Sequence, residues 1–385
     1  MSESSLSGGV LPPDGPLRLT PEGLYCVPAE AWIDPWRPVA RALLTHAHAD
    51  HARPGSGAYW ATTPSEAVLR QRLGAHINLT PVPYGVPFQL GGAQISLHSA
   101  GHVLGSAQIL IEAAGERWLI SGDYKRDADP SCARFTPVQA DVFISEATFG
   151  LPLYRWLPGA EVARDILSWW QQAPSIPSIL CCYAFGKAQR LLAELHALGV
   201  EEDVLLHGAI QALMEPYRAA GIAMAPTRPL SGWPKGESLA GRLVLAPPSA
   251  LRTPWMRRFP KAQTGFASGW MAVRGVRRRR GYGRGFVLSD HADWPSLVRT
   301  IEESGAQQVF LTHGHGDPLA RYLREEKGIT AHTLRSSEPE AWTRDAGEER
   351  GEGSGDGTSE WPSEEASERT GERTGEEAGD RPGPG

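Results

Sequence analysis

The sequence predicts a layered α/β fold in which one domain is inserted into another. Short apolar runs, bounded by Gly and Pro, alternate with helix-like stretches in the first part of the chain. A second alternation begins near Glu161, and a third follows the basic stretch Arg274–Arg284. The length of 385 residues also exceeds the usual prior of about 100–200 residues per domain. The middle block is therefore predicted to interrupt the first domain.

Each element follows from its local pattern of apolar residues. Before residue 156 we expect a helix at Ser65–Leu73 and strands at Leu24–Ile33, Ala93–Ala100, Ala107–Ala113, Arg117–Ser121 and Val142–Ser145. The middle block is predicted to hold helices at Glu161–Gln172, Lys187–Leu198 and Gln211–Ala220, and strands at Ser178–Tyr183 and Asp203–His207. The last block is predicted to run as strand Gly285–Ser289, helix Pro295–Ser304, strand Gln307–Thr312 and helix Pro318–Lys327.

The two ends of the chain differ from the rest in composition. Residues 1–17 are predicted to form a flexible arm, and residues 336–385 an acidic tail with 15 acidic and 5 basic residues. This tail has almost no apolar residues with which to offset its ordering entropy, so we expect it to be disordered. The remaining boundaries are 18–155 for the first part of the outer domain, 156–284 for the inserted domain and 285–335 for the return segment. Residues 1–335 carry a net charge of +4.

Composition argues against a membrane protein. No apolar run approaches the roughly 18–20 residues needed to cross a bilayer. The first residues, Met1–Ser5, lack the basic start and apolar segment of a signal peptide. We therefore expect a cytoplasmic protein with no membrane partner.

The most informative motif lies directly after the apolar run Ala42–Leu44. It reads Thr45-His46-Ala47-His48-Ala49-Asp50-His51 and places three imidazoles and a carboxylate within six residues. These are preferred ligands of zinc and similar divalent ions. Because four ligands so close in sequence cannot converge on one ion without strain, the spacing favours two ions. The alternative is a histidine-rich surface loop.

Further candidate ligands follow other predicted strands. His102 lies in Ser99-Ala100-Gly101-His102, Asp123 ends Ile120-Ser121-Gly122-Asp123, and His313 follows Leu311-Thr312. In layered α/β folds the loops after the strands expose side chains at one edge. We therefore expect these residues to meet the first motif.

Together these motifs resemble the metallo-β-lactamase superfamily. Glu146 in Ser145-Glu146-Ala147-Thr148, His291 in Ser289-Asp290-His291-Ala292-Asp293, and His313 resemble the A, B and C motifs of the β-CASP nucleases. Trp32-Ile33-Asp34-Pro35-Trp36 and Tyr183-Ala184-Phe185-Gly186-Lys187-Ala188-Gln189-Arg190 look most like the bacterial ligase-associated DNA exonucleases. The resemblance covers about residues 20–335. It implies an αββα sandwich with an inserted α/β β-CASP cap domain.

The resemblance also implies a set of roles. One zinc ion would be held by His46, His48 and His102, a second by Asp50, His51 and His313, and both would be bridged by Asp123. Asp34 would orient ligands without touching the metal, and Mn²⁺ is an alternative to Zn²⁺. Two such ions activate a shared water toward phosphorus and neutralise the charge that builds on the phosphate.

Departure of the sugar oxygen requires a proton or a cation, and His291 is the predicted general acid. Glu146 is predicted to hold its imidazole in the correct tautomer. The alternative interpretation of this stretch is a helix cap, because Asp290 is a good candidate for the N-cap position.

A polyanionic substrate is indicated by basic residues in the inserted block. Arg277, Arg278, Arg279 and Arg280 are predicted to contact phosphates, as is Lys187 at the start of a predicted helix. Trp255, Trp270 and Tyr282 are candidates for stacking on bases, with core packing as the alternative.

Three functions therefore remain open. The family resemblance favours a DNA exonuclease that acts in repair with an ATP-dependent ligase and a helicase. A histidine at the C position, as in His313, is typical of RNA-cleaving β-CASP members and favours an RNA-processing ribonuclease. The superfamily core alone also fits a hydrolase of small thioesters or lactones.

Overall fold

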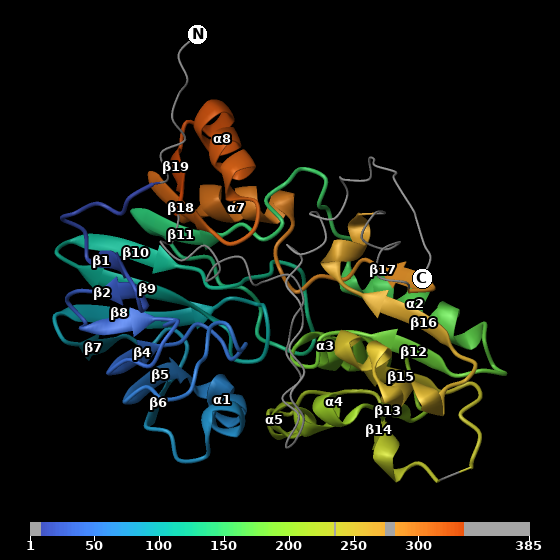
Figure 1. Ribbon diagram of the computed structural model, residues 1–385. Coiled ribbons are helices and arrows are strands. Elements are labelled where there is room, and N and C mark those ends of the chain that lie inside the picture. Colours follow the sequence, from blue (N-terminus) through green and yellow to red (C-terminus); the bar gives the residue numbers. More distant parts are fainter. Residues whose placement is uncertain (1–8, 235, 274–281, 335–385) are drawn as a thin grey trace, which may run out of the picture. The chain divides into compact units, whose positions relative to one another are not determined.

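The computed structural model describes residues 9–234, 236–273 and 282–334. The predicted tail at 336–385 and the four arginines Arg277–Arg280 lie outside these ranges. Figure 1 shows the described elements in chain order. They form three β-sheets with helices between and around them, which confirms the predicted mixed α/β class.

The first sheet has the order β1-β2-β3-β4-β5-β6. Its strands are β1 (Leu17–Thr20), β2 (Gly23–Cys26), β3 (Ala31–Ile33), β4 (Arg41–Leu43), β5 (Ala58–Thr62) and β6 (Leu79–Val82). The single strand predicted at Leu24–Ile33 is instead the antiparallel pair β2 and β3. The turn between them contains Glu30 at a φ of 49°, which ends the extended run.

The second sheet has the order β19-β18-β11-β10-β9-β8-β7. It comprises β7 (Phe88–Leu90), β8 (Ala93–Ser99), β9 (Ala107–Ala113), β10 (Glu116–Ile120), β11 (Val142–Glu146), β18 (Gln308–Thr312) and β19 (Thr330–Thr333). Strands β10, β11 and β18 are parallel, and Glu146 pairs with Thr312 in register. Because β9 is antiparallel to both β8 and β10, strand β8 runs in the same direction as β10. The carboxyl ends of all four strands therefore meet at one edge.

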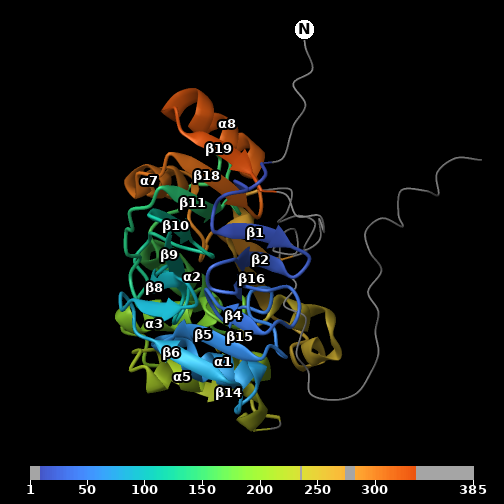
Figure 2. The ribbon, with the colours of Figure 1, turned by 90° about the vertical axis from the view of Figure 1, so that its left-hand side faces the viewer.

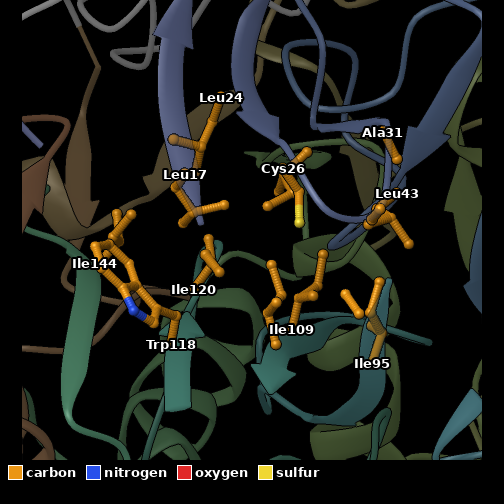
Figure 3. Packing of buried hydrophobic residues seen from close by; sticks show 14 of the residues in the cluster. Leu17, Leu24, Cys26, Ala31, Leu43, Ile95, Ile109, Trp118, Ile120 and Ile144 are labelled. Carbon is orange, nitrogen blue, oxygen red and sulfur yellow. The ribbon is translucent and has the colours of Figure 1, made fainter. Parts of the chain in front are cut away.

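The first two sheets pack face to face as a sandwich, and Figure 2 shows the blue strands of the first beside the teal strands of the second. Figure 3 shows Leu17, Leu24, Cys26 and Leu43 pointing toward Ile95, Ile109, Trp118 and Ile120. Alternate residues of each strand reach this layer, as the period of two requires.

Helices cover the outer faces of the sandwich. Helix α1 (Glu66–Leu73) places Val68 and Leu69 against the first sheet. Helices α7 (Trp294–Ser304) and α8 (Gly316–Lys327) cover the second with Leu297, Ile301, Leu319 and Leu323, among others. Burial of each such side chain contributes about 1.5–3 kcal/mol.

The third sheet is parallel throughout and has the order β14-β13-β15-β12-β16-β17. Its strands are β12 (Ser178–Cys181), β13 (Val204–Leu206), β14 (Thr227–Pro229), β15 (Leu243–Ala246), β16 (Gln263–Ala267) and β17 (Arg284–Phe286). Its helices are α2 (Gly159–Gln171), α3 (Lys187–Ala197), α4 (Gly208–Ala212) and α5 (Met214–Ala219). We call this part the cap. Because β17 ends at Phe286, the cap extends two residues beyond 284, the predicted end of the inserted domain.

Within the described ranges, none of the helices combines the length and apolarity that a bilayer crossing demands.

Candidate metal centre

The candidate ligands lie where strands of the sandwich end. The His46–His51 motif follows β4, Asp34 follows β3, and His102, Asp123 and His313 follow β8, β10 and β18. Glu146 is the last residue of β11. Gly122 has a φ of 54°, and a Cβ there would lie 2.5 Å from the Cβ of Thr45, so only glycine lets these loops approach so closely.

Four of the predicted ligands form a compact group. One ligand atom from each of His46, His48, His102 and Asp123 lies within 4.8 Å of all the others. Asp123 Oδ2 is 3.4 Å from His46 Nε2 and 3.7 Å from His102 Nε2. His48 Nδ1 is 3.1 Å from His102 Nε2. We call this the first ligand group.

Hydrogen bonds from backbone carbonyls orient two of these three imidazoles. His48 Nε2–H donates to the carbonyl of Phe185 at 3.3 Å, and His102 Nδ1–H donates to the carbonyl of Asp290 at 2.7 Å. With those protons placed, His48 Nδ1 and His102 Nε2 turn their lone pairs toward one another. In metal sites, a carbonyl that accepts from one ring nitrogen in this way fixes the tautomer in which the other nitrogen can bind the metal.

The donor set of the first group fits a divalent metal. His46 Nε2 is buried, and it has no hydrogen-bond partner among the described residues. Burial lowers the pKa of His46 and His102 well below the usual range, helped by neighbouring imidazoles, and lowers the pKa of His48 to about 4. These rings are therefore neutral at pH 7, which is the form that binds a metal.

A second set of predicted ligands surrounds His51. His51 Nε2 lies 3.5 Å from Asp123 Oδ2 and 3.6 Å from Asp50 Oδ2. On its other side, His51 Nδ1–H donates to Asp34 Oδ2 at 2.7 Å. The ring centre of His313 is 5.4 Å from that of His51. We call Asp50, His51, His313 and Asp123 the second ligand group.

The electrostatics of the second group favour a cation. Burial opposes protonation of His51, but Asp123, Asp50 and Asp34 outweigh it and raise the pKa of His51 well above its usual value. Burial also disfavours the charge on Asp50, but His51, His48 and His313 lower the pKa of Asp50 to about 2. The clustered carboxylates thus stabilise positive charge where the resemblance expects an ion.

Glu146 and His291 form a pair beside the ligand groups. His291 Nδ1–H donates to Glu146 Oε2 at 3.0 Å, while the backbone N–H of Tyr124 donates to Glu146 Oε1 at 2.7 Å. Burial raises the cost of ionising Glu146, yet His291 and these hydrogen bonds lower the pKa of Glu146 overall. One ligand atom each of Asp123, Glu146 and His291 lies within 4.8 Å of the others.

The region of His291 is not a helix cap formed by Asp290. The N-cap of α7 is Asp293, whose side chain accepts from the N–H of Ser296 at 3.0 Å. Asp290 is 4% exposed, and its carboxylate accepts from Lys187 Nζ at 2.6 Å.

Lys187 is therefore placed differently from the prediction, which assigned it to a nucleic-acid surface. Its side chain is almost fully buried, and its charge is paired inside the molecule. The first turn of α3 is also closed, because Gln189 Oε1 accepts from the N–H of Gly186 at 2.8 Å. A phosphate has no access to this helix start.

The aromatic candidates pack within the cap and against its neighbours. Trp270 lies 4.8 Å from Phe149, Trp255 lies 4.8 Å from Phe259, and Tyr282 stacks on Phe266 at 4.7 Å between ring centres. These contacts favour the packing interpretation for Tyr282 in particular.

The structure also reveals a basic surface that the sequence analysis missed. Arg252, Arg257 and Arg258 are exposed on two short 3-10 helices after β15, η3 (Pro248–Arg252) and η4 (Pro254–Arg258). None of the three forms an ion pair with another described residue. Trp255 contacts His207 at 5.2 Å, and Arg258 donates to the carbonyl of Leu230. His207 and Leu230 directly follow the carboxyl ends of β13 and β14, so these contacts place the arginines at the carboxyl edge of the third sheet. We call the three arginines together with Trp255 the basic loop.

No family model matches the chain. A protein named Probable DNA ligase from Opitutus terrae is 33% identical over 343 residues, which cover 84% of this chain and 32% of that protein. Endoribonuclease YSH1 from Mycosarcoma maydis is 22% identical, covering 82% and 46% of the two chains. Cleavage and polyadenylation specificity factor subunit 3 from Dictyostelium discoideum is 27% identical, covering 43% and 26%.

This chain thus spans less than half of the length of each of these relatives. A solved structure of a protein of unknown function from Enterococcus faecalis V583 matches with a TM-score of 0.52 and 11% identity, covering 77% of this chain and 79% of that one. That likeness concerns the fold alone. The curated relatives support the resemblance to the metallo-β-lactamase superfamily and its β-CASP members.

Proposed function

We propose that this chain is a metal-dependent nuclease that hydrolyses phosphodiester bonds of DNA as an exonuclease. The observation that carries the proposal is the position of Asp123, which lies 3.4 Å from His46 of the first ligand group, 3.5 Å from His51 of the second, and within 4.8 Å of ligand atoms of Glu146 and His291. A metal centre and a proton donor at one carboxylate are the parts that phosphodiester hydrolysis needs.

The first ligand group would hold one divalent ion and the second group another, with Asp123 shared. Zinc suits the imidazole-rich donor set, and manganese suits the carboxylates of the second group. Ions bound there supply an activated water and a counter-charge for the phosphate oxygens.

The chain's own residues supply the proton. Glu146 holds His291 by Nδ1 at 3.0 Å, and we assign the protonation of the departing sugar oxygen to Nε2 on the other side of the same ring. The imidazole is 16% exposed, which permits contact with a substrate, whereas Glu146 is buried. Attraction between His291 and the buried carboxylate lowers the pKa of Glu146, so Glu146 stays charged beside the proposed acid.

A polyanionic substrate is supported by the basic loop. All strands of the third sheet are parallel, so their carboxyl ends share one edge. At that edge, the chain after β12 includes Phe185, which contacts His48. The basic loop lies at the carboxyl ends of the neighbouring strands, where Trp255 contacts His207. A phosphate backbone leaving the metal centre along this edge meets Arg252, Arg257 and Arg258.

The choice of DNA rests on the relative from Opitutus terrae, in which a segment similar to this chain belongs to a protein named as a DNA ligase. The occurrence of such a segment within a protein named as a ligase supports action of this chain alongside an ATP-dependent ligase. A helicase is a further expected partner. The second candidate is an RNA-processing ribonuclease, because other relatives are named endoribonucleases.

Digestion of end-labelled single-stranded DNA, duplex DNA and matched RNA with zinc or manganese tests the proposal. We expect stepwise shortening of DNA that is lost in Asp123→Ala. His291→Ala should lose less activity on a nitrophenyl phosphodiester than on DNA, because the nitrophenolate leaving group needs no proton. Preferential cleavage of RNA would support the second candidate, and turnover of a thioester or lactone alone would refute both.

A further inference from the structure

The two faces of the third sheet are covered by different elements. Side chains alternate along each strand, so Leu206 packs among helices α2 to α5 on one face, while Leu205 packs in a cluster with Trp233 on the other. Four 3-10 helices contribute to this second cluster, namely η2 (Leu230–Gly232), η3, η4 and η5 (Gly269–Ala272). We call this side of the cap the 3-10 face.

The segment that carries η2, η3 and η4 is strongly basic. Residues 226–263 contain seven basic residues and one acidic residue, Glu237, a net charge of +6. Residues 156–225, which contain helices α2 to α5, hold four basic and seven acidic residues, a net charge of −3. The positive charge of the cap is thus concentrated in the segment of the 3-10 face, where it attracts polyanions.

Two arginines of this segment lie against one aromatic ring. Arg228 on β14 pairs in register with Leu205, which places it on the 3-10 face. The guanidinium of Arg228 lies 5.2 Å from the ring centre of Trp233, and that of Arg242 lies 5.3 Å from it. Arg228 is exposed and Arg242 half-buried, and neither forms an ion pair with another residue in the described ranges. Two like charges beside one ring repel each other, and a bound anion relieves that repulsion.

These two arginines are continuous with the basic loop. Arg258 of the basic loop donates to the carbonyl of Leu230 at 3.3 Å, and Arg228 donates to the carbonyl of Gly232 at 3.4 Å. Helix η2 therefore has an arginine at each end. Arg242 directly precedes β15, whose four residues span roughly 13 Å. The basic side chains thus extend from the carboxyl edge of the sheet to the amino end of β15.

We propose that Arg228, Arg242 and the basic loop form one phosphate-binding surface, along which a single strand of nucleic acid runs from the metal centre across the 3-10 face. This inference rests on the proposed function for the identity of the ligand. Contacts to phosphates carry no sequence information, so the surface holds a strand of any sequence. It favours long substrates, because only a long strand reaches from the metal centre to the amino end of β15.

Binding and cleavage of a long single strand test this surface. Binding is measured against salt concentration in EDTA, which prevents cleavage. Arg228→Ala/Arg242→Ala should reduce the log–log slope by about 1.4, because each phosphate contact on a single strand accounts for about 0.7. With metal present, KM for the long strand should rise roughly tenfold, while kcat/KM for a dinucleotide stays unchanged. Arg228→Lys/Arg242→Lys, which keeps both charges, should retain most of the slope.

The matched control removes two arginines from the helical face of the cap. Arg164 lies on α2, and Arg218 on α5 donates to Thr227, whose side chain alternates to the face opposite that of Arg228. Arg164→Ala/Arg218→Ala changes the net charge equally and should leave the slope and KM close to those of the wild type. Equal losses in both double variants would overturn the inference, because they would reflect net charge alone.

The inference and the proposed function fail in different ways. A wild-type chain that binds the strand but cleaves no phosphodiester would refute the proposed function, and the salt slope in EDTA would still decide the inference. Normal cleavage together with an unchanged slope and KM in Arg228→Ala/Arg242→Ala would refute the inference alone.

Discussion

The two ligand groups of this chain use the same residue types but different support. In the first group, His48 and His102 are held by backbone carbonyls at Phe185 and Asp290, both in or next to the cap. In the second, His51 is held by the carboxylate of Asp34 from the sandwich. A carbonyl only fixes a ring, whereas a carboxylate also favours its positive form. The three imidazoles of the first group therefore favour the neutral form, whereas the carboxylates around His51 raise its pKa.

Asp123 belongs to both groups, so its replacement should have the largest effect. Asp123→Asn removes the charge that lies between His46, His51 and His102 while keeping the shape of the side chain. We expect nuclease activity to fall by about 10⁴-fold or more, as for central catalytic groups. Metal analysis of the purified variant should show loss of more than one ion, and retention of both would contradict the shared role.

Glu146 lies outside both groups and should change the pH dependence. The carboxylate favours the protonated form of His291, and a general acid is active only while protonated. Glu146→Gln should therefore move the alkaline limb of the pH–rate profile to lower pH and reduce the rate by about 100-fold near neutrality. Metal content should not change. An unshifted profile would assign the pair a purely structural role.

Asp34→Asn should act mainly on the second ligand group, because Asp34 accepts directly from His51 and reaches His46 of the first group only through Thr45. Asp34 has a φ of 43°, and asparagine tolerates this backbone conformation, so the fold is retained. The neutral amide no longer stabilises positive charge near His51, and the second step of a calorimetric titration with Zn²⁺ should weaken by about 10- to 100-fold. The first step, identified with His102→Ala, serves as the internal reference; a loss confined to that first step would contradict the comparison.

The smallest effect is expected for the basic loop, which touches neither group. Neutralising Arg252, Arg257 and Arg258 should reduce the salt dependence of single-strand binding by about 0.7 in log–log slope for each phosphate that the loop no longer binds. Cleavage of a dinucleotide should be unaffected. Neutralising Arg299, Arg321 and Lys327 on α7 and α8 removes the same charge and controls for net electrostatics. An equal reduction in both variants would argue against a specific track.

Candidate metal ligands are easier to recognise in the sequence than the residues that surround them, for a physical reason. Candidate metal ligands such as His46, His48 and Asp50 are close in sequence, and their spacing alone suggests a metal. Buried ion pairs leave no such trace, because Lys187 and Asp290 are 103 residues apart. The sequence alone predicts a surface position for Lys187, since an isolated lysine at a helix start is usually solvated.

The fold shows the same limit. Strands β9 and β11 lie where alternation and apolar content predict them, whereas β3 and β4 have only three residues each and show no period. The exposed arginines of the basic loop were missed for the opposite reason. Arg252 and Arg257 are ordinary surface residues in sequence, and only the parallel order of the third sheet brings them to the edge that Phe185 shares.

The chain passes between sandwich and cap twice, and both passages are tied together beside His291, the proposed proton donor. Trp156 Nε1–H donates to the carbonyl of His291 at 2.9 Å, and the N–H of Trp156 donates to Asp293 at 3.1 Å. The cap is consequently not a removable module, despite its separate sheet. Excising it, or moving the chain ends to this point by circular permutation, cuts through the support of His291 itself. Engineers who wish to exchange the cap must carry the Trp156 segment and the 289–293 segment with it.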